Sequence, residues 1–269
     1  MGLHSDSKYC LPVVCAPKPH TVDEMQATIN FQQTNKFTVK SEYQMPTLDG
    51  IFQKIKGNTF STFDGEEGYH KVRMSKDSIK LNSLKAVGVT MSCNGMIGGM
   101  KNAGNHYQQE SDKMLSKNTA MGVALNRFAN RFVNDTIIYS NGMEEHIRQV
   151  DNILAQMLAD NIKPKWRKAQ FGLKRVHFGG RIVSKHGIEV LKDKAEIICQ
   201  LRRPQGWKDV QRIYGMFLWH KQWINHFDQK AKPITRFLSG KLKHMIIDWD
   251  KDAERAYTLL CDDISKAVA

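Results

Sequence analysis

The sequence lacks several features that mark common protein classes, and each absence narrows what the chain can be. No run of 18 apolar residues occurs in its 269 residues, so no segment is predicted to span a membrane. The opening MGLHSDSKYC does not have the charged-then-apolar order of a secretory signal, and we expect an intracellular protein that is not secreted and does not bind membranes. There is no internal repeat and no low-complexity segment. The 41% of hydrophobic residues is enough for a globular core.

Sequence patterns for metal binding and for disulfides are also missing. The five cysteines are scattered and odd in number, and no two of them form a CxxC pair. They indicate neither a zinc site nor a disulfide framework. The ten histidines are scattered as well. We therefore interpret the cysteines as packed thiols and the histidines as surface or core residues.

Positive charge is abundant and is concentrated in one segment. The formal net charge is +13, and residues 161–221 hold 15 basic and 4 acidic residues, an excess of 11. The flanking segments are almost balanced, with 17 basic and 16 acidic residues before and 8 and 7 after. Such a concentration predicts a surface for a polyanion. The alternative is a solvated basic surface without a partner.

The spacing of apolar residues predicts an α+β lobe up to residue 170 and a mainly helical lobe after residue 190. Strands are expected at 13–17 and 37–41 and as two pieces around the acidic bend in 59–75, and 87–100 is expected to be loop or irregular strand. A hairpin is expected over 171–190, and helices are expected at 102–118, 143–160, 193–203 and 207–224. The apolar face of 143–160 is predicted to comprise Ile147, Val150, Ile153, Leu154, Met157 and Leu158.

Two carboxylates stand at the edges of predicted strands. Asp64 lies in FSTFDGEEGYH, and Asp135 lies in RFVNDTIIYS directly after Asn134. Two strands that each bring a carboxylate to one edge can hold divalent metal ions about 3.5–4 Å apart for phosphoryl transfer. Such ions take hard oxygen ligands, for which aspartate is the expected residue. On spacing alone, a turn and a metal site both remain open.

Several motifs together resemble the reverse transcriptase of gypsy-class long-terminal-repeat retrotransposons. STFDGEEGYHKVRM (61–74) resembles the family's S-x-L-D-L-x-x-G-Y-H-Q-I-R-M, and FVNDTIIYS (132–140) stands where the family has Y-x-D-D-I-L-I-Y-S. FGGRIVSKHGI and AKPITRFLSG, farther along, resemble F-L-G-H-x-V-S-x-x-G-I and A-K-P-L-T-x-L-L. The motifs are collinear with the family over nearly the whole chain.

The resemblance implies an α+β right-hand polymerase fold. It places fingers and palm at 1–170, a primer-grip-like hairpin and a helical thumb at 171–225, and the start of a connection segment at 226–269. The family's protease, ribonuclease H and integrase are expected to be absent from this degenerate member.

The resemblance also assigns catalytic positions to Asp64, Asn134 and Asp135, with Asp64 and Asp135 as the expected metal ligands. The family has an acid where this chain has Asn134. A neutral amide offers one carbonyl oxygen and no charge, so metal affinity and charge neutralisation at the transferring phosphate should both fall. We expect no metal cofactor, and magnesium or manganese only where some activity remains.

Further departures fall in the nucleotide pocket that the resemblance implies. The family's Pro-Phe-Gly is Ile97-Gly98-Gly99, its Ala-Pro-x-x-Phe corresponds to 103–107, and its basic triphosphate clamp aligns with Gln26. Tyr69 is retained at the position that senses the sugar 2′ group. Loss of an anion clamp removes binding energy that a polymerase uses to position its substrate.

The basic segment interleaves cations with aromatic residues over the predicted hairpin and thumb. The predicted nucleic-acid-binding residues are Lys163, Lys165, Trp166, Arg167, Lys168, Lys174, Arg175, Arg181, Arg202, Arg203, Lys208 and Arg212. Cations neutralise phosphates, and exposed aromatic rings stack on bases with about 1–3 kcal/mol each. Phe217, Trp219 and Trp223 are predicted instead to fill the helical core.

These observations predict a retrotransposon-derived reverse-transcriptase-like protein without catalysis, a pseudoenzyme. It would be a scaffold that contacts RNA or DNA, together with protein subunits of a ribonucleoprotein or another assembly. One alternative is an active RNA-directed DNA polymerase with a relaxed metal site, in which Asp64, Asp135 and Glu66 or Glu67 hold one manganese ion. Another is a structural subunit that binds only proteins, with its basic face on an acidic partner.

Overall fold

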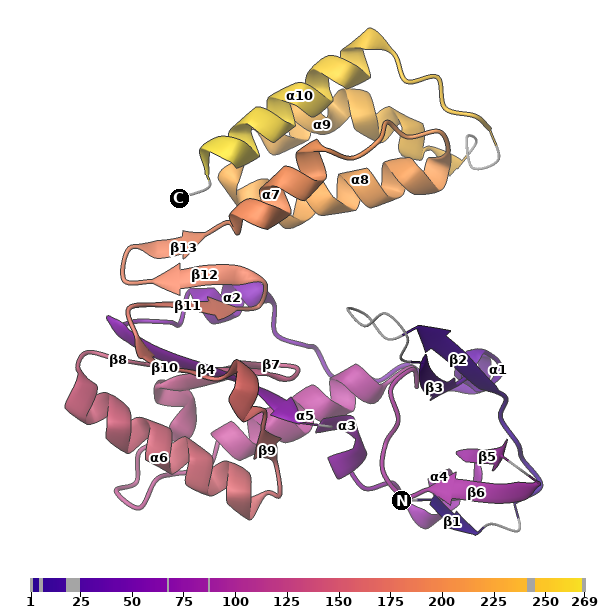
Figure 1. Cartoon of the computed structure of the whole chain (residues 1–269), viewed down its shortest axis with the longest axis vertical. Coiled ribbons are helices and arrows are strands. Elements are labelled where there is room, and N and C mark those ends of the chain that lie inside the picture. Colours follow the sequence, from indigo (N-terminus) through magenta and orange to yellow (C-terminus); the bar gives the residue numbers. More distant parts are fainter. Residues whose placement is uncertain are drawn as a thin grey trace. The chain divides into compact units, whose positions relative to one another are not determined.

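A computed structural model describes residues 2–4, 7–17, 25–66, 68–86, 88–240 and 245–267. The chain divides into two compact units, Met1–Gly179 and Gly180–Ala269 (Figure 1). The first unit mixes strands and helices, and the second has a short hairpin followed by helices, so the predicted α+β class is confirmed. In the described part of the chain, no helix has both the length and the apolar character needed to cross a bilayer.

The elements of each unit follow in chain order. The strands of the first unit are β1 (Gly2–His4), β2 (Val13–Pro17), β3 (Met25–Ile29), β4 (Thr59–Glu66), β5 (Ser83–Ala86), β6 (Val89–Cys93), β7 (Ala129–Phe132), β8 (Asp135–Ser140), β9 (Lys163–Pro164), β10 (Gln170–Leu173) and β11 (Arg175–Phe178). Its helices are α1 (Gln32–Phe37), α2 (Leu48–Phe52), α3 (Gly68–Lys71), α4 (Lys76–Lys80), α5 (Ala103–Leu115) and α6 (Met143–Ala159), with 3-10 turns at Leu125–Arg127 and Trp166–Lys168. The second unit has β12 (Arg181–Ser184), β13 (Gly187–Glu189), α7 (Lys192–Cys199), α8 (Trp207–Trp219), α9 (Phe227–Thr235) and α10 (Lys251–Lys266), with 3-10 turns at Lys221–Trp223 and Arg236–Leu238.

The central sheet of the first unit has the order β10-β4-β8-β7, and β9 pairs with the end of β4. Strands β4 and β8 are antiparallel, with a register that runs from Thr59 opposite Ser140 to Asp64 opposite Asp135. From Thr136 to Ser140, β8 is buried at every position. Burial on both faces explains why the strand is a continuous apolar run and does not alternate.

Helices α5 and α6 cover this sheet, with Met114 of α5 and Ile153 and Met157 of α6 packed against Phe63 and Ile138. Ile147 and Leu158 were predicted for the buried face of α6, but they are 55% and 80% exposed, and this prediction was wrong. The buried stripe of α6 runs instead through His146, Val150, Ile153 and Met157 at spacings of three and four residues. A polar residue therefore occupies the first position of the stripe.

His146 fits this buried position because both of its ring nitrogens have partners. Its Nε2 lies 2.6 Å from Ser61 Oγ on β4, and its Nδ1 lies 2.7 Å from Ser140 Oγ on β8. Ser61 Oγ also accepts a hydrogen bond from the backbone N–H of Gly172. A buried imidazole thus links the start of α6 to three strands of the central sheet, which satisfies the polar groups involved.

Removal of this imidazole should cost stability in a way that depends on pH. Burial lowers the pKa of His146, so the unfolded chain takes up a proton more readily than the folded one. The free energy of unfolding should therefore fall as pH drops below about 6.5. His146→Ala should lower it by about 2–4 kcal/mol at pH 7.5, because it leaves two buried hydroxyl groups without their partner. Denaturant titrations at pH 7.5 and 5.5 measure both effects.

A matched control for that prediction is His106→Gln, because His106 is exposed. This control should keep the full pH dependence, whereas His146→Gln should weaken it. The remaining dependence in His146→Gln should come from His220 in the second unit, whose pKa burial also lowers. An unchanged pH dependence in His146→Gln would contradict the assignment.

The second unit is built around one apolar cluster from its four helices. Val210, Ile213 and Phe217 of α8 pack there with Tyr257 and Leu260 of α10. The hydroxyl group of Tyr257 donates to the carbonyl oxygen of Ile198, at the end of α7. This cluster gives the second unit a core of its own.

Of the three aromatic residues predicted for this core, only Trp219 differs from the expectation. Phe217 is fully buried, as predicted, but Trp219 is 46% exposed, and Trp223 is half-buried. Both indoles lie beside the guanidinium of Arg181, which is 5.1 Å from the ring centroid of Trp219 and 4.8 Å from that of Trp223. Trp223 nevertheless packs against the core cluster, whereas Trp219 is not part of it.

Several predicted elements are also corrected by the structure. The strand expected at 37–41 is absent, since α1 ends at Phe37 and Val39 is 85% exposed, which leaves no apolar face to bury against a sheet. Part of the second strand expected within 59–75 forms helix α3 instead. Strand β6 is regular within 87–100, where loop or irregular strand was expected. Helix α7 ends at Cys199, four residues before the predicted end.

Candidate functional site

The two predicted carboxylates meet across the central sheet. Asp64 of β4 and Asp135 of β8 are directly paired in the antiparallel register. The turn between β7 and β8 is Val133-Asn134, and the carbonyl oxygen of Asn134 accepts a hydrogen bond from the N–H of Gly65 at 2.9 Å. This closes the end of the sheet, so Asp64, Asn134 and Asp135 lie at one edge, as the sequence predicted.

The turn itself is held in a strained backbone conformation. Val133 has a φ of +53°, a region that is unfavourable for a β-branched residue. Its N–H donates to Gln108 Oε1 of α5 at 2.8 Å, and the amide of Gln108 donates in turn to the carbonyl oxygen of Arg131. Gln108 is fully buried. Helix α5 therefore fixes the turn that carries Asn134.

The side chain of Asn134 is unusual in its surroundings. Its Oδ1 is buried and has no hydrogen-bond partner among the described residues. An aspartate at this position would add a third carboxylate to the end of the sheet that holds Asp64 and Asp135. The asparagine keeps the shape of the acid and avoids a third negative charge, at the cost of one unsatisfied carbonyl oxygen.

Protein cations lie close to the two remaining acids. Lys165 Nζ is 3.6 Å from Asp64 Oδ2, and the backbone N–H of Lys165 donates to the carbonyl oxygen of Asp64 at 2.7 Å. Burial raises the pKa of Asp135, and the charge of Asp64 raises it further, whereas the N–H of Gly179 and the charge of Lys168 act to lower it. Two lysine charges thus offset two carboxylate charges at this edge.

The donor set does not fit a pair of divalent cations. Among the described residues, no group of three or more His, Cys, Asp or Glu side chains converges on one point. Glu67 lies outside the described residues, and of Glu66 only the backbone in β4 is described. Two carboxylates that already have lysine neighbours supply too little free negative charge for two divalent ions.

The predicted nucleotide-pocket residues are distributed over two apolar clusters. Tyr69 of α3 lies 5.1 Å from the ring of Tyr107 and packs in a cluster that includes Val133, so it lies near the turn. Ile97 packs in a different cluster, with Ile29 and Phe31. These contacts bring Tyr69 to the acidic edge but do not bring Ile97 there.

The glycines of the same segment have different conformational needs. Gly99 has a φ of +94°, which requires glycine, whereas a Cβ on Gly98 would meet no atom within 4 Å. Gln26 lies in β3, where its backbone pairs with Ala16, and its side chain is outside the described structure. Gly98 is therefore a position where the fold would accept a side chain and the sequence has none.

Arg131 lies near the acidic edge and was not identified from the sequence, whereas its partner Tyr107 belongs to the segment 103–107 that was. Arg131 is almost fully buried behind Gly65, and its Nη2 donates to Tyr107 Oη at 2.8 Å. Its Nε and Nη1 have no hydrogen-bond partner in the described part of the chain. A cation in the otherwise strand-like run ANRFV was the signal that could have revealed it. It adds a buried positive charge to the strand next to β8.

The predicted nucleic-acid-binding residues of the first unit are mostly exposed. Lys163, Arg167, Lys168, Lys174 and Arg175 are exposed, and Lys165 is half-buried. Trp166 is 61% exposed and stacks on Phe171 at 6.3 Å, and Phe171 packs in turn on the buried Phe63. Phe171 thus anchors the indole to the core and leaves Trp166 accessible beside these cations.

The predicted residues of the second unit are less uniform. Arg202, Lys208 and Arg212 are exposed. Arg203 is also exposed, but it forms a two-point ion pair with Glu254 at 2.6 Å. Arg181 is only 4% exposed and donates to the carbonyl oxygen of Trp219. Arg181 thus lacks the accessibility that a phosphate contact needs.

Comparisons with known proteins agree with this architecture. Residues 17–216 match the family model described as reverse transcriptase (RNA-dependent DNA polymerase). The chain is 26% identical over 222 residues to the retrovirus-related Pol polyprotein from transposon gypsy and 25% identical over 243 residues to that from transposon 297, both of Drosophila melanogaster. These matches cover 81% and 89% of the chain, which spans about a fifth of each relative, 21% and 22%.

Solved structures show the same fold. The foamy viral protease-reverse transcriptase in complex with double-stranded DNA has a TM-score of 0.85 at 18% identity, over 99% of this chain and 45% of that one. The same viral protein in complex with an RNA/DNA hybrid has a TM-score of 0.83 at 18% identity, over 99% of this chain and 35% of that one. The chain therefore belongs to the reverse transcriptase family and is related to the Pol polyproteins of gypsy-type retrotransposons.

Proposed function

We propose that this chain is a retrotransposon-derived reverse-transcriptase pseudoenzyme that contacts nucleic acid as a scaffold and does not polymerise. The observation that carries the proposal is the acidic edge of the central sheet. Asn134 replaces an acid there, and the Lys165 ammonium lies 3.6 Å from Asp64. A site whose charge is already balanced by lysine has little affinity for the two cations that in-line phosphoryl transfer uses.

The exposed cations and the anchored indole of the first unit support the nucleic-acid part of the proposal. Lys163, Arg167 and Lys168 can neutralise phosphates, and Trp166 can stack on a base without first being ordered, because Phe171 already holds it. The viral relatives of the same fold were solved in complexes with DNA and with an RNA/DNA hybrid. We infer that RNA or DNA is the partner here, with protein subunits of a larger ribonucleoprotein beside it.

Primer extension tests the loss of catalysis. The purified chain should incorporate no templated deoxynucleotide on a primed RNA template, in magnesium or in manganese. Asp64→Asn is the matched control, because it removes one of the two acids and changes the shape of the side chain little. Templated incorporation that disappears in Asp64→Asn would overturn the proposal and establish a polymerase with a relaxed metal site.

A further inference from the structure

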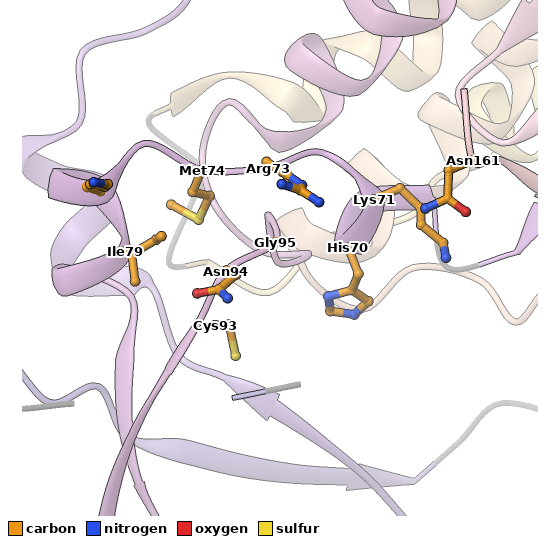
Figure 2. A pocket seen from close by; sticks show the side chains of 10 residues that line it. His70, Lys71, Arg73, Met74, Ile79, Cys93, Asn94, Gly95 and Asn161 are labelled. Atoms are coloured by element: carbon orange, nitrogen blue, oxygen red, sulfur yellow. The ribbon is translucent and has the colours of Figure 1, made fainter. Parts of the chain in front are cut away.

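A cavity of about 950 Å³ lies in the first unit, apart from the acidic edge (Figure 2). It is lined by α3 and the residues after it, by α4, and by the turn that follows β6. The walls are fixed by backbone contacts, since Met74 N–H donates to the carbonyl oxygen of Asn94 at 3.0 Å and Met96 N–H to that of Val72 at 2.8 Å. A Cβ on Gly95 would lie 2.2 Å from the carbonyl oxygen of His70, so the two walls meet closely there.

The charge of the lining is one-sided. The cations Lys71, Arg73 and Lys76 line the cavity beside His70, and none of the described residues that line it is an aspartate or a glutamate. Within the described ranges, the side chains of these three cations make neither an ion pair nor a hydrogen bond. Like charges that face one concave space repel each other and focus a positive potential in it, which a bound anion would relieve.

Three other lysines of the same unit do have partners. Lys113 pairs with Glu110 at 2.7 Å, and Lys117 pairs with Asp160 at 2.6 Å. Lys101 donates to the backbone carbonyl oxygen of Thr38 at 2.8 Å. The distinguishing feature of Lys71, Arg73 and Lys76 is that they line the same cavity.

The remaining lining is apolar or amide in character. Met74, Ile79 and Cys93 line the cavity, together with the amides of Asn94 and Asn161 (Figure 2). A nucleotide has the same division, with phosphates at one end and a flat, weakly polar base with hydrogen-bonding edges at the other. The volume is in the range of small-molecule sites. A duplex carries its phosphates on a convex surface and cannot enter such a cavity.

We propose that this cavity binds a nucleotide through its phosphates, which Lys71, Arg73 and Lys76 contact, with the base against Met74 and Ile79. The site is separate from the predicted polymerase pocket, because neither Tyr69 nor the segment 97–99 lines it. It does not depend on Asp64 and Asp135, so it stands or falls independently of the proposed scaffold function. The nucleotide is either a free nucleoside triphosphate or one unit of a single strand.

Titration calorimetry of the full chain with ATP, in buffer that contains a chelator, tests the phosphate contacts. The triple variant Lys71→Gln, Arg73→Gln, Lys76→Gln should weaken ATP binding at least about tenfold, since it removes three charge-assisted contacts. A short single-stranded oligonucleotide in place of ATP forms the second arm. Binding of ATP identifies a free nucleotide as the ligand, and binding of the oligonucleotide alone identifies a nucleotide within a strand.

The matched control removes three exposed lysines of the same unit that lie outside the cavity: Lys40→Gln, Lys54→Gln and Lys56→Gln. It has the same net charge as the cavity triple and should bind like the unsubstituted chain. Equal weakening in both triples would overturn the proposal, because it would show general attraction to a basic surface. Absence of binding by both ATP and the oligonucleotide would overturn it as well.

A second readout needs no substitution and does not depend on the folding of a variant. Cys93 lines the cavity, whereas Cys10 and Cys15 are exposed elsewhere in the unit. Saturating ligand should slow the alkylation of Cys93 several-fold and leave Cys10 and Cys15 unchanged, as followed by peptide mass mapping. An unchanged rate at Cys93 under saturating ligand would contradict binding in this cavity.

Discussion

Asn134→Asp is expected to lower the free energy of unfolding in metal-free buffer and to make the chain respond to divalent cations. The substitution adds a third carboxylate at an edge where burial and the charge of Asp64 already raise the pKa of Asp135. A buried, uncompensated charge at this position should cost about 1–3 kcal/mol at pH 7. The new carboxylate also completes a better oxygen ligand set for magnesium or manganese.

Thermal unfolding with and without the metal measures both parts of this prediction. Magnesium that binds the variant should recover stability, by about 2.7 kcal/mol at a concentration 100 times its Kd, and the unsubstituted chain should show no such gain. A variant with unchanged stability and no metal response would show that the amide is not what limits the site. Equal metal stabilisation of both chains would show that the lysines do not compete with metal.

Asp135→Asn is the opposite change and serves as the matched control. The pKa of Asp135 is higher in the folded chain than in the unfolded chain. The protonated carboxyl group therefore favours the folded state below about pH 4, and this stabilisation is lost as pH rises through the raised pKa. At pH 7 the charged carboxylate therefore destabilises the folded chain. Asp135→Asn should raise the thermal midpoint by about 2–4 °C for each kcal/mol gained, and it should do so without metal.

Asn134→Asp alone should not restore templated synthesis. The segment predicted to position the nucleotide would still be Ile97-Gly98-Gly99, and the residue at the predicted clamp position would still be Gln26. The space around Gly98 suits a further step, since a side chain there would meet no atom within 4 Å. Robust synthesis by the single variant would show that these other departures matter little.

The second large effect concerns nucleic-acid binding by the first unit. The triple variant Lys163→Gln, Arg167→Gln, Lys168→Gln removes three exposed cations. The slope of log K against log salt is negative, and each lost phosphate contact should reduce its magnitude by about 0.9 on duplex DNA. The triple variant should therefore reduce the magnitude by nearly three times that amount. Fluorescence anisotropy with a labelled duplex at several salt concentrations measures the slope.

The control and cavity triples provide the comparisons for this measurement. Lys40→Gln, Lys54→Gln, Lys56→Gln has the same charge and should keep the slope, and so should the cavity triple. A flat salt response of the unsubstituted chain would remove the nucleic-acid part of the proposed function and favour a protein partner. That result would leave ATP binding in the cavity unaffected, so the two proposals fail separately.

Trp166→Ala tests stacking without any change of charge. An indole that stacks on a base should contribute about 1–3 kcal/mol to single-strand binding, and its loss should leave the salt slope unchanged. Trp166→Phe is the conservative control and should retain most of the affinity. If both variants bind normally but unfold at lower temperature, the indole only covers Phe171.

The motifs around Asp64 and Asp135 allowed the meeting of the two acids to be predicted. When two antiparallel strands carry an acid at matching ends, one register buries the apolar residues of both strands. Strands β4 and β8 have that register. The exposure of Ile147 and Leu158 could not be predicted in this way. Apolar spacing identifies a helix face, but a buried imidazole with two serine partners decides which part of that face is covered.

The amino-acid sequence by itself determined the family and the mixed fold, and it places an amide, Asn134, beside Asp135, because these depend on residue order and local pattern. Only the tertiary structure decided that Lys165 lies against Asp64, that Arg181 is buried beside two indoles, and that three unpaired cations face one cavity. The physical reason is that charge interactions depend on distance and burial, which folding sets between residues far apart in the chain.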